Sequence, residues 1–157
     1  MTQCIKLGLT TRTEACTMIV ELPYLADISI NHCFNRGQVR FGYKQSVKDW
    51  KQLLKDSILA ELNGKVWSPP IHFQYLVLYP SRTRKGDPPN MNKIIQDAIA
   101  EALGFDDTME NVIGGPHFGF KTRHKEGKII ISIHKLENIV VPDFLLDKIG
   151  TDFVLKE

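Results

Sequence analysis

Three aspartates and one lysine near the middle of the chain have side chains suited to metal-dependent chemistry. Asp87 and Lys93 share one short polar segment, and Asp106 and Asp107 follow a helix-like run that ends at Gly104. Mg²⁺ prefers oxygen ligands, and nucleases typically hold it with a few convergent carboxylates that leave positions for a phosphate and a water. These residues favour a site for Mg²⁺, or alternatively Mn²⁺, formed by Asp87, Asp106 and Asp107, with Lys93 supporting a phosphate.

The same four residues also have purely structural interpretations. Asp87 can be a helix N-cap, because its short carboxylate accepts hydrogen bonds from free backbone N–H groups. Asp106 and Asp107 can form a polar turn after the helix, and Lys93 can be a solvated helix residue. Sequence alone leaves both interpretations open.

Two groups of basic residues flank this segment on either side. The first group precedes Asp87 directly and the second lies in a later stretch bounded by glycines: Arg82, Arg84 and Lys85, then Lys121, Arg123, His124 and Lys125. Each group could neutralise several phosphates through charge-assisted contacts. Such short basic runs are also common on solvated loops, so the prediction of DNA binding rests on their position beside the carboxylates.

Length and composition set the broad class of the protein. The chain has 157 residues, of which 43% are hydrophobic and 24% charged, with a formal net charge of +2, as expected for one globular domain. No apolar run reaches the roughly 18 residues of a membrane span, and the first residues lack the plan of a secretory signal. The spacing of the three cysteines matches no disulfide framework or zinc motif, so we expect reduced thiols in a cytoplasmic protein.

Apolar and β-branched residues predict the strands of the fold. These strands run from Met18 to Leu22, from Ile71 to Tyr79 and from Lys128 to Lys135, and a further strand starts at Val112. Glu126-Gly127 is typical of a hairpin turn. With two main helices, the pattern predicts one α+β domain over residues 1–157, with a core at about 18–137 and a C-terminal tail at 138–157. We expect a mixed or mostly antiparallel sheet with both helices on one face.

Helical spacing of apolar residues predicts the two helices. The first opens with a capping box at Ser46 to Asp49 and ends at Asn63-Gly64. The second runs from Pro88 to Leu103 with Asp87 as its N-cap, which would make it roughly 24 Å long. Aspartates at opposite ends of such a helix cannot share one ion.

Three arrangements would bring those aspartates together. The first turns are not helical, the loop after Gly104 folds back, or two copies of the helix pack antiparallel across a two-fold axis. We favour the homodimer, in which each site takes Asp87 from one subunit and Asp106 and Asp107 from its partner.

The central segment resembles the signature of a known family. Asp87-Pro-Pro-Asn90-Met-Asn-Lys93, followed by Phe105-Asp106-Asp107, is similar to the DxDNLxK…DD pattern of the RusA-type Holliday-junction resolvases, small endodeoxyribonucleases of phages and prophages. Leu22-Pro23 and the segment from Ser29 to His32 are similar to the N-terminal LP…SxNx segment of that family. The resemblance covers roughly residues 18 to 137.

The resemblance implies a homodimer that binds four-way DNA junctions and resolves them by paired Mg²⁺-dependent nicks in DNA recombination and repair. Asp87, Lys93 and Asp107 would be catalytic, with Asp106 beside them and Asn90 contacting DNA. The cell would be a bacterium or a phage-infected host. The chain departs from the pattern at Pro89, which replaces the middle aspartate and whose side chain cannot bind a metal.

Two further interpretations come from other functional classes. The first is a catalytically impaired relative that binds branched DNA, or regulates phage DNA processing, without cleavage. The second is an interaction module whose tail binds a protein partner through two apolar clusters, Phe144-Leu-Leu146 and Phe153-Val-Leu155.

A stretch near the second basic group adds one more candidate contact. His117 lies in the glycine-rich stretch from Gly114 to Gly119, which either contacts DNA or forms an irregular strand or hairpin. Phe118 and Phe120 either insert into a junction or pack inward.

Overall fold

Strand β2 (Ile71–Tyr79) lies in the middle of a five-stranded mixed sheet. The computed structural model describes residues 17–35, 42–108 and 111–136. On one side of β2, β5 (Lys128–Lys135) and then β1 (Thr17–Pro23) pair in antiparallel fashion, and on the other side β3 (Val112–Gly114) and β4 (Phe118–Lys121) pair with it in parallel. The four strands predicted from the sequence are confirmed.

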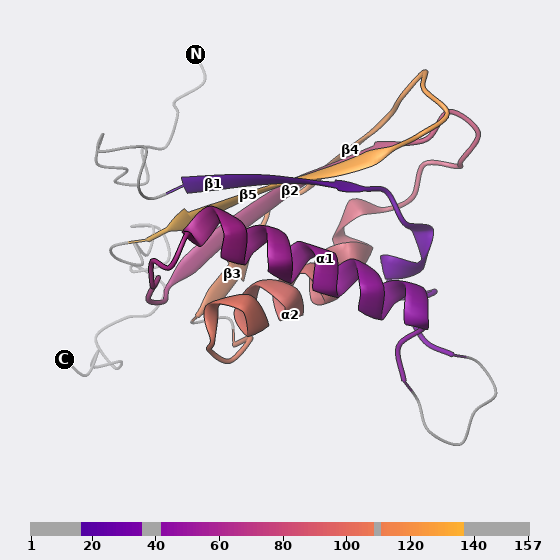
Figure 1. Ribbon diagram of the computed structural model, residues 1–157. Helices are drawn as coiled ribbons and strands as arrows, with labels where there is room; N and C mark the ends of the chain where they lie inside the picture. Colours follow the sequence, from indigo (N-terminus) through magenta and orange to yellow (C-terminus); the bar gives the residue numbers. More distant parts are fainter. Residues whose placement is uncertain (1–16, 36–41, 109–110, 137–157) are drawn as a thin grey trace, which may run out of the picture.

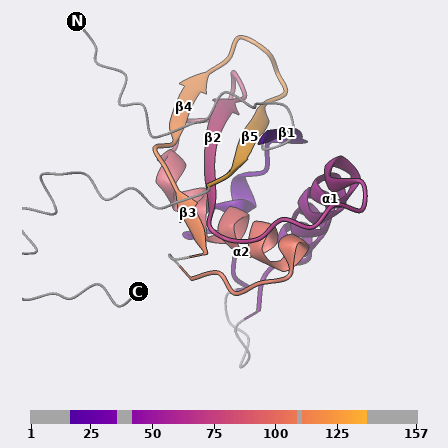
Figure 2. The ribbon, with the colours of Figure 1, turned by 90° about the vertical axis from the view of Figure 1, so that its left-hand side faces the viewer.

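The two faces of the sheet differ because side chains alternate along each strand. Every second residue of β2 is buried, and the buried residues of β1 and β5 lie on the same face. Helices α1 (Gln45–Leu62) and α2 (Asn92–Leu103) cover that face, as Figures 1 and 2 show. The predicted α+β domain with two helices on one face of a mixed sheet is therefore confirmed.

The start of α1 differs from the predicted capping box. Ser46 lies inside the helix and its Oγ donates a hydrogen bond to Asp27 Oδ2 at 2.9 Å, so it does not cap the helix. Lys44 Nζ donates to Asp27 Oδ1 at 2.8 Å. The Asp27 carboxylate therefore binds both residues at the start of the helix, and these tertiary contacts take the place of a capping box. The predicted end is confirmed, because Asn63 adopts the left-handed conformation with φ 48°.

The start of α2 also differs from the prediction. Pro88–Met91 forms a short 3₁₀ helix, η2, and α2 begins only at Asn92. Asp87 occupies the N-cap position of η2, as predicted for this helical segment, but its side chain makes no capping hydrogen bond. Two successive prolines lack N–H groups, and Pro89 disfavours α-helical geometry at Pro88, which explains the tighter first turn. The helix ends at Gly104 as predicted, with φ 83°.

The predicted hairpin at Glu126-Gly127 does not form, because β4 and β5 flank β2 on opposite sides. The connection between them crosses the end of β2. Thr122 N–H donates to the carbonyl of Tyr79 at 2.9 Å. A Cβ at Gly127 would lie 2.3 Å from the carbonyl oxygen of Leu78, so the close crossing requires a glycine there.

No helix in the three described ranges is long and apolar enough to cross a membrane. The apolar clusters predicted to bind a partner, in the tail at 138–157, lie outside the described residues, as do Cys4 and Cys16.

Candidate nucleic-acid interface and active site

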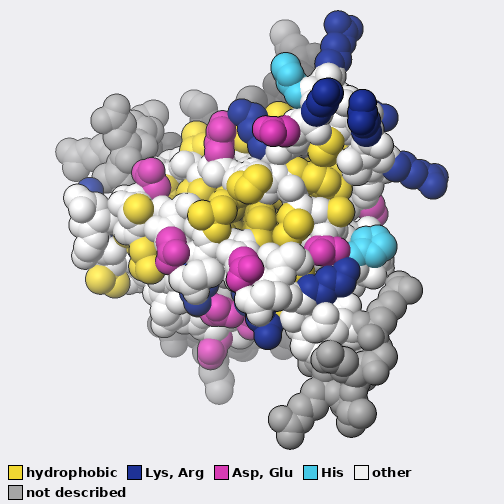
Figure 3. Space-filling model, turned by 45° about the vertical axis from the view of Figure 1, so that its right-hand side comes forward, with side chains coloured by type: hydrophobic (Ala, Val, Ile, Leu, Met, Phe, Trp, Pro, Cys, Tyr) yellow, Lys and Arg dark blue, Asp and Glu magenta, His cyan; other side chains and the backbone are white. Residues whose placement is uncertain are grey.

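The two basic groups come together at the end of β2. Ser81 N–H donates to the carbonyl of His124 at 2.8 Å, which joins the loop after β2 to the connection between β4 and β5. All six predicted DNA-binding Lys and Arg side chains are exposed: Arg82, Arg84, Lys85, Lys121, Arg123 and Lys125. On the face shown in Figure 3, Lys and Arg side chains gather at this end of the molecule. We call these six residues the basic surface.

A pocket of about 610 Å³ adjoins the basic surface and contains the first half of the signature; we call it the Asp87 pocket. Its lining residues are Tyr24, Ala26, Ser29, Asn31, His32, Tyr79, Thr83, Arg84, Lys85, Gly86, Asp87, Asn90 and Met91. Ile30 N–H donates to the carbonyl of Asn90 at 2.7 Å, which ties the two walls of the pocket together. The Ser29–His32 segment and the Asp87–Asn90 segment of the resemblance thus line one pocket.

The charges of the Asp87 pocket are mixed. Arg84, Lys85 and His32 contribute basic groups, and Asp87 contributes one exposed carboxylate. Burial, reinforced by Tyr24 and Asp87, raises the pKa of Tyr79 to about 12, so its hydroxyl stays protonated. The pocket therefore offers cations around one carboxylate, with the neutral Tyr79 hydroxyl buried behind its wall.

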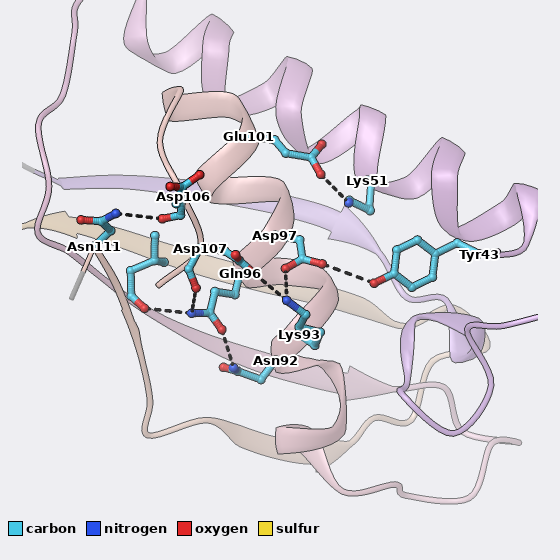
Figure 4. A network of polar contacts seen from close by, with 11 residues as sticks. Tyr43, Lys51, Asn92, Lys93, Gln96, Asp97, Glu101, Asp106, Asp107 and Asn111 are labelled. Atoms are coloured by element: carbon cyan, nitrogen blue, oxygen red, sulfur yellow. Dashed lines mark hydrogen bonds and ion pairs between the residues drawn. The ribbon is translucent and has the colours of Figure 1, made fainter. Parts of the chain in front are cut away.

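The second half of the signature lies on α2, because the chain after Gly104 folds back along the helix (Figure 4). Lys93 Nζ forms ion pairs with Asp107 Oδ2 and, at 2.7 Å, with Asp97 Oδ1. Gln96 Nε2 donates to the carbonyl of Asp107 at 3.1 Å and holds the returning chain in place. Lys93 and Asp107 therefore meet within one chain, without the help of a second subunit.

Asp97 is a member of this cluster that the sequence prediction missed. Its side chain is only 14% exposed, and Tyr43 Oη donates to its Oδ2 at 3.3 Å. Burial raises the pKa of Asp97, whereas the hydrogen bond from Lys93 holds the pKa of Asp107 below its usual range. The same two carboxylates raise the pKa of Lys93, which stays charged. The spacing of Asp97 four residues after Lys93 was the available signal.

Neutral side chains continue the hydrogen bonding from α2 to the sheet. Tyr75 N–H donates to His117 Nδ1 at 3.3 Å, so the ring proton lies on Nε2, which donates to Asn92 Oδ1 at 2.8 Å. Asn92 Nδ2 in turn donates to Gln96 Oε1 at 3.3 Å. Burial lowers the pKa of His117 to about 4, and its ring stacks on Tyr75 with centroids 3.7 Å apart.

These residues form one connected set, which we call the α2 polar network. Its members are Tyr43, Asn92, Lys93, Gln96, Asp97, Asp107 and His117. The contact of His117 with DNA is not supported by this position, because both ring nitrogens are occupied inside the protein. The predicted alternative of an irregular strand fits better, since β3 and β4 both pair with β2 on either side of His117.

The three predicted metal ligands do not share a pocket. Asp106 and Asp107 line a second pocket, of about 290 Å³, with Lys93, Asp97 and Glu101, whereas Asp87 lines the Asp87 pocket. Among the residues that the structure describes, no group of three or more His, Cys, Asp or Glu side chains could hold a metal ion. Among the described residues, the three predicted Mg²⁺ ligands therefore do not form one cluster.

Fold and site together define a small α+β domain that carries a basic surface, an adjoining mixed-charge pocket and a closed polar network. No model of a known protein family matches the chain, and a search of curated proteins finds no match. The likeness to RusA-type resolvases therefore rests on the residues themselves and stays a prediction.

Proposed function

We propose that the protein is a RusA-like endodeoxyribonuclease that binds four-way DNA junctions and nicks them. One observation carries the proposal: two basic segments far apart in the sequence are hydrogen-bonded side by side, next to the pocket that contains Asp87 and Asn90. Six exposed cations at one end of a small domain provide contacts for several phosphates.

The signature residues support the catalytic part of the proposal. Asp87 is exposed in the pocket beside the basic surface, where a phosphate held by Arg84 or Lys85 would come within its reach. Lys93 and Asp107, the other predicted catalytic residues, are already paired. The requirement for Mg²⁺ or Mn²⁺ rests on the resemblance, since Asp87, Asp106 and Asp107 do not form one cluster among the described residues.

A homodimer remains part of the proposal, for a changed reason. The fold-back of Asp107 removes the need to span a long helix, but Asp87 and Asp107 still line different pockets. A second copy of the chain could complete a centre that one copy leaves divided. Two such centres would make the paired nicks on opposite strands of a junction.

The direct test uses labelled DNA and the purified protein. A four-way junction, a linear duplex and a single strand are incubated with and without Mg²⁺ or Mn²⁺, and the products are separated on denaturing gels. We expect symmetric nicks on the junction alone, lost in Asp87→Asn and in Asp107→Asn. Equal cutting of all three substrates, or cutting that survives in both variants, would reject the proposed resolvase.

Mixing the two variants tests whether sites are shared. If each centre takes Asp87 from one subunit and Asp107 from the other, mixed dimers regain up to one working site after subunit exchange. No recovery, with exchange verified by tagged subunits, would place both aspartates in the same subunit's centre.

A second candidate function is junction binding without cleavage. Pro89 in place of an aspartate and the separation of the carboxylates between two pockets favour it. This protein would bind the junction tightly, as would its Asp107→Asn variant, and neither would cut it under any metal.

A further inference from the structure

The Asp87 pocket contains groups that phosphate binding and nicking leave unused. Tyr24 is half-buried in its wall and packs edge to face against Tyr79, with ring centroids 5.4 Å apart. Ser29, Asn31 and Asn90 add hydroxyl and amide groups to the lining. A phosphate alone needs neither an aromatic ring nor amides, so these residues point to a larger ligand.

The size of the pocket also exceeds the needs of a phosphate. Its volume of about 610 Å³ lies within the range of roughly 300 to 1,000 Å³ found for small-molecule sites. An aromatic ring, hydrogen-bonding amides and flanking cations are the three kinds of group that hold a nucleotide's base, base edge and phosphate. All three occur here on one lining.

The hydroxyl of Tyr79 is an independent sign of a missing ligand. Tyr79 is fully buried, and its Oη has no hydrogen-bond partner among the described residues. A Cβ at Gly86 would lie 3.3 Å from this oxygen, so the hydroxyl sits against a pocket residue that has no side chain. A buried hydroxyl left unpaired is costly. Because Tyr79 Oη has almost no accessible surface, a polar group of a ligand reaches it only when the chain at Gly86 moves aside.

We propose that the Asp87 pocket binds one nucleotide, extruded from the DNA beside the branch point, with its base against Tyr24 and its phosphate at Arg84 and Lys85. Asn31 and Asn90 face the edge of the base, and Asp87 then lies next to the phosphate of that nucleotide. The inference rests on the proposed function for the source of the nucleotide. The pocket chemistry is the same for a free nucleotide.

A cycle that combines a mutation with a DNA change tests the proposal. Affinity is measured by fluorescence anisotropy, without divalent metal, for intact junctions and for junctions that carry one abasic site, moved nucleotide by nucleotide across the branch point. At one position the abasic site should weaken binding by wild type about fivefold or more, the range of one base stacked on an aromatic ring. Tyr24→Ala should weaken binding of the intact junction to the same extent and leave the affinity for that abasic junction unchanged.

Two controls separate stacking from general damage. Tyr24→Phe keeps the ring and should behave as wild type. Leu59→Ala removes an exposed apolar side chain of α1 outside the pocket and should leave the abasic effect in place. Where Tyr24→Ala fails to fold, Tyr79→Phe replaces it: this variant should raise the melting temperature, because it removes an unpaired hydroxyl, yet bind the intact junction more weakly.

The outcomes distinguish this inference from the proposed function. Losses in Tyr24→Ala that are equal for intact and abasic junctions at every position would overturn the nucleotide pocket while leaving junction binding in place. If no DNA binds at all, titration with the four deoxynucleoside monophosphates, followed by NMR of the tyrosine rings, decides. Shifts confined to Tyr24 and Tyr79 assign the pocket to a free nucleotide, and no shifts overturn it.

Discussion

The Asp87 pocket and the α2 polar network contain the two halves of one signature but differ in how their polar groups are satisfied. In the network, Lys93 is paired with two carboxylates, and each nitrogen of His117 has a protein partner. In the pocket, Asp87, Arg84 and Lys85 are exposed, and Tyr79 Oη is unpaired within the described residues. The network therefore holds Lys93 and Asp107 in fixed positions through contacts within the protein, whereas the pocket leaves its charged groups open to a ligand.

Acid should destabilise the α2 polar network through protonation of His117. Its folded pKa of about 4 lies below the ordinary histidine value of 6.5, so the unfolded state binds more protons between these values. Stability from this group is present above about pH 6.5 and lost as the pH falls towards 4, by up to roughly 2 kcal/mol because water still screens part of the ring. Urea unfolding across that range should show a smaller loss in His117→Gln, since His134 titrates in both proteins. Parallel curves would contradict a structural role for the neutral ring.

Gly119→Ala should disturb the contact that joins β4 to the signature. An added Cβ would lie 2.7 Å from Pro88 Cγ and 2.9 Å from Tyr79 Cε2, and both belong to rigid rings. We expect a loss of about 1–3 kcal/mol in the free energy of unfolding, as in other overpacked sites. Gly42→Ala is the matched control, because an added Cβ there meets nothing within 4 Å. Equal stabilities of the two variants would show that β4 moves freely.

Removing one carboxylate from each region compares them directly. Asp97→Ala removes one of the two carboxylates paired with Lys93 and the acceptor of the Tyr43 hydroxyl. We expect a loss of about 1–2 kcal/mol in the free energy of unfolding. Asp87→Ala removes an exposed side chain without a capping bond and should change stability by less than about 0.5 kcal/mol. Chemical denaturation measures both. A larger loss in Asp87→Ala would reverse the assignment of structure to the network and binding to the pocket.

Substitutions in the basic surface should have the smallest effect per residue, and they should change only the affinity for DNA. Arg84→Ala combined with Arg123→Ala removes one cation from each basic segment and should weaken junction binding roughly tenfold. The slope of log affinity against log salt concentration should fall by about 2. Lys65→Ala with Lys135→Ala is the control, because Lys135 pairs with Ile71 at the opposite end of β2. If both double variants lose the same affinity, the basic surface is not the DNA contact.

Sequence patterns predicted the strands well because a strand buried on one face alternates buried and exposed residues. The pattern predicted two strands with the bounds that the structure shows, Ile71–Tyr79 and Lys128–Lys135. The pairing of β4 with β2 could not, because it depends on a crossing that only the close approach of Gly127 to Leu78 reveals.

The candidate site was predictable in its residues but not in its grouping. The sequence identified Asp87 and Asn90 as site residues but not the residues that share their pocket. Tyr24 and Tyr79 line that pocket from distant segments of the chain. The pairing of Asp107 with Lys93 depends on the fold-back after Gly104, which no local pattern encodes.

Competition binding tests the central claim, that this domain recognises branched DNA, most directly. Wild-type protein bound to a labelled four-way junction, without divalent metal, is challenged with unlabelled junction and with a linear duplex of the same arm sequences. The proposed function predicts that the junction competes at least roughly tenfold better than the duplex, above the non-specific binding that any basic surface provides. Equal competition by the two DNAs would contradict it.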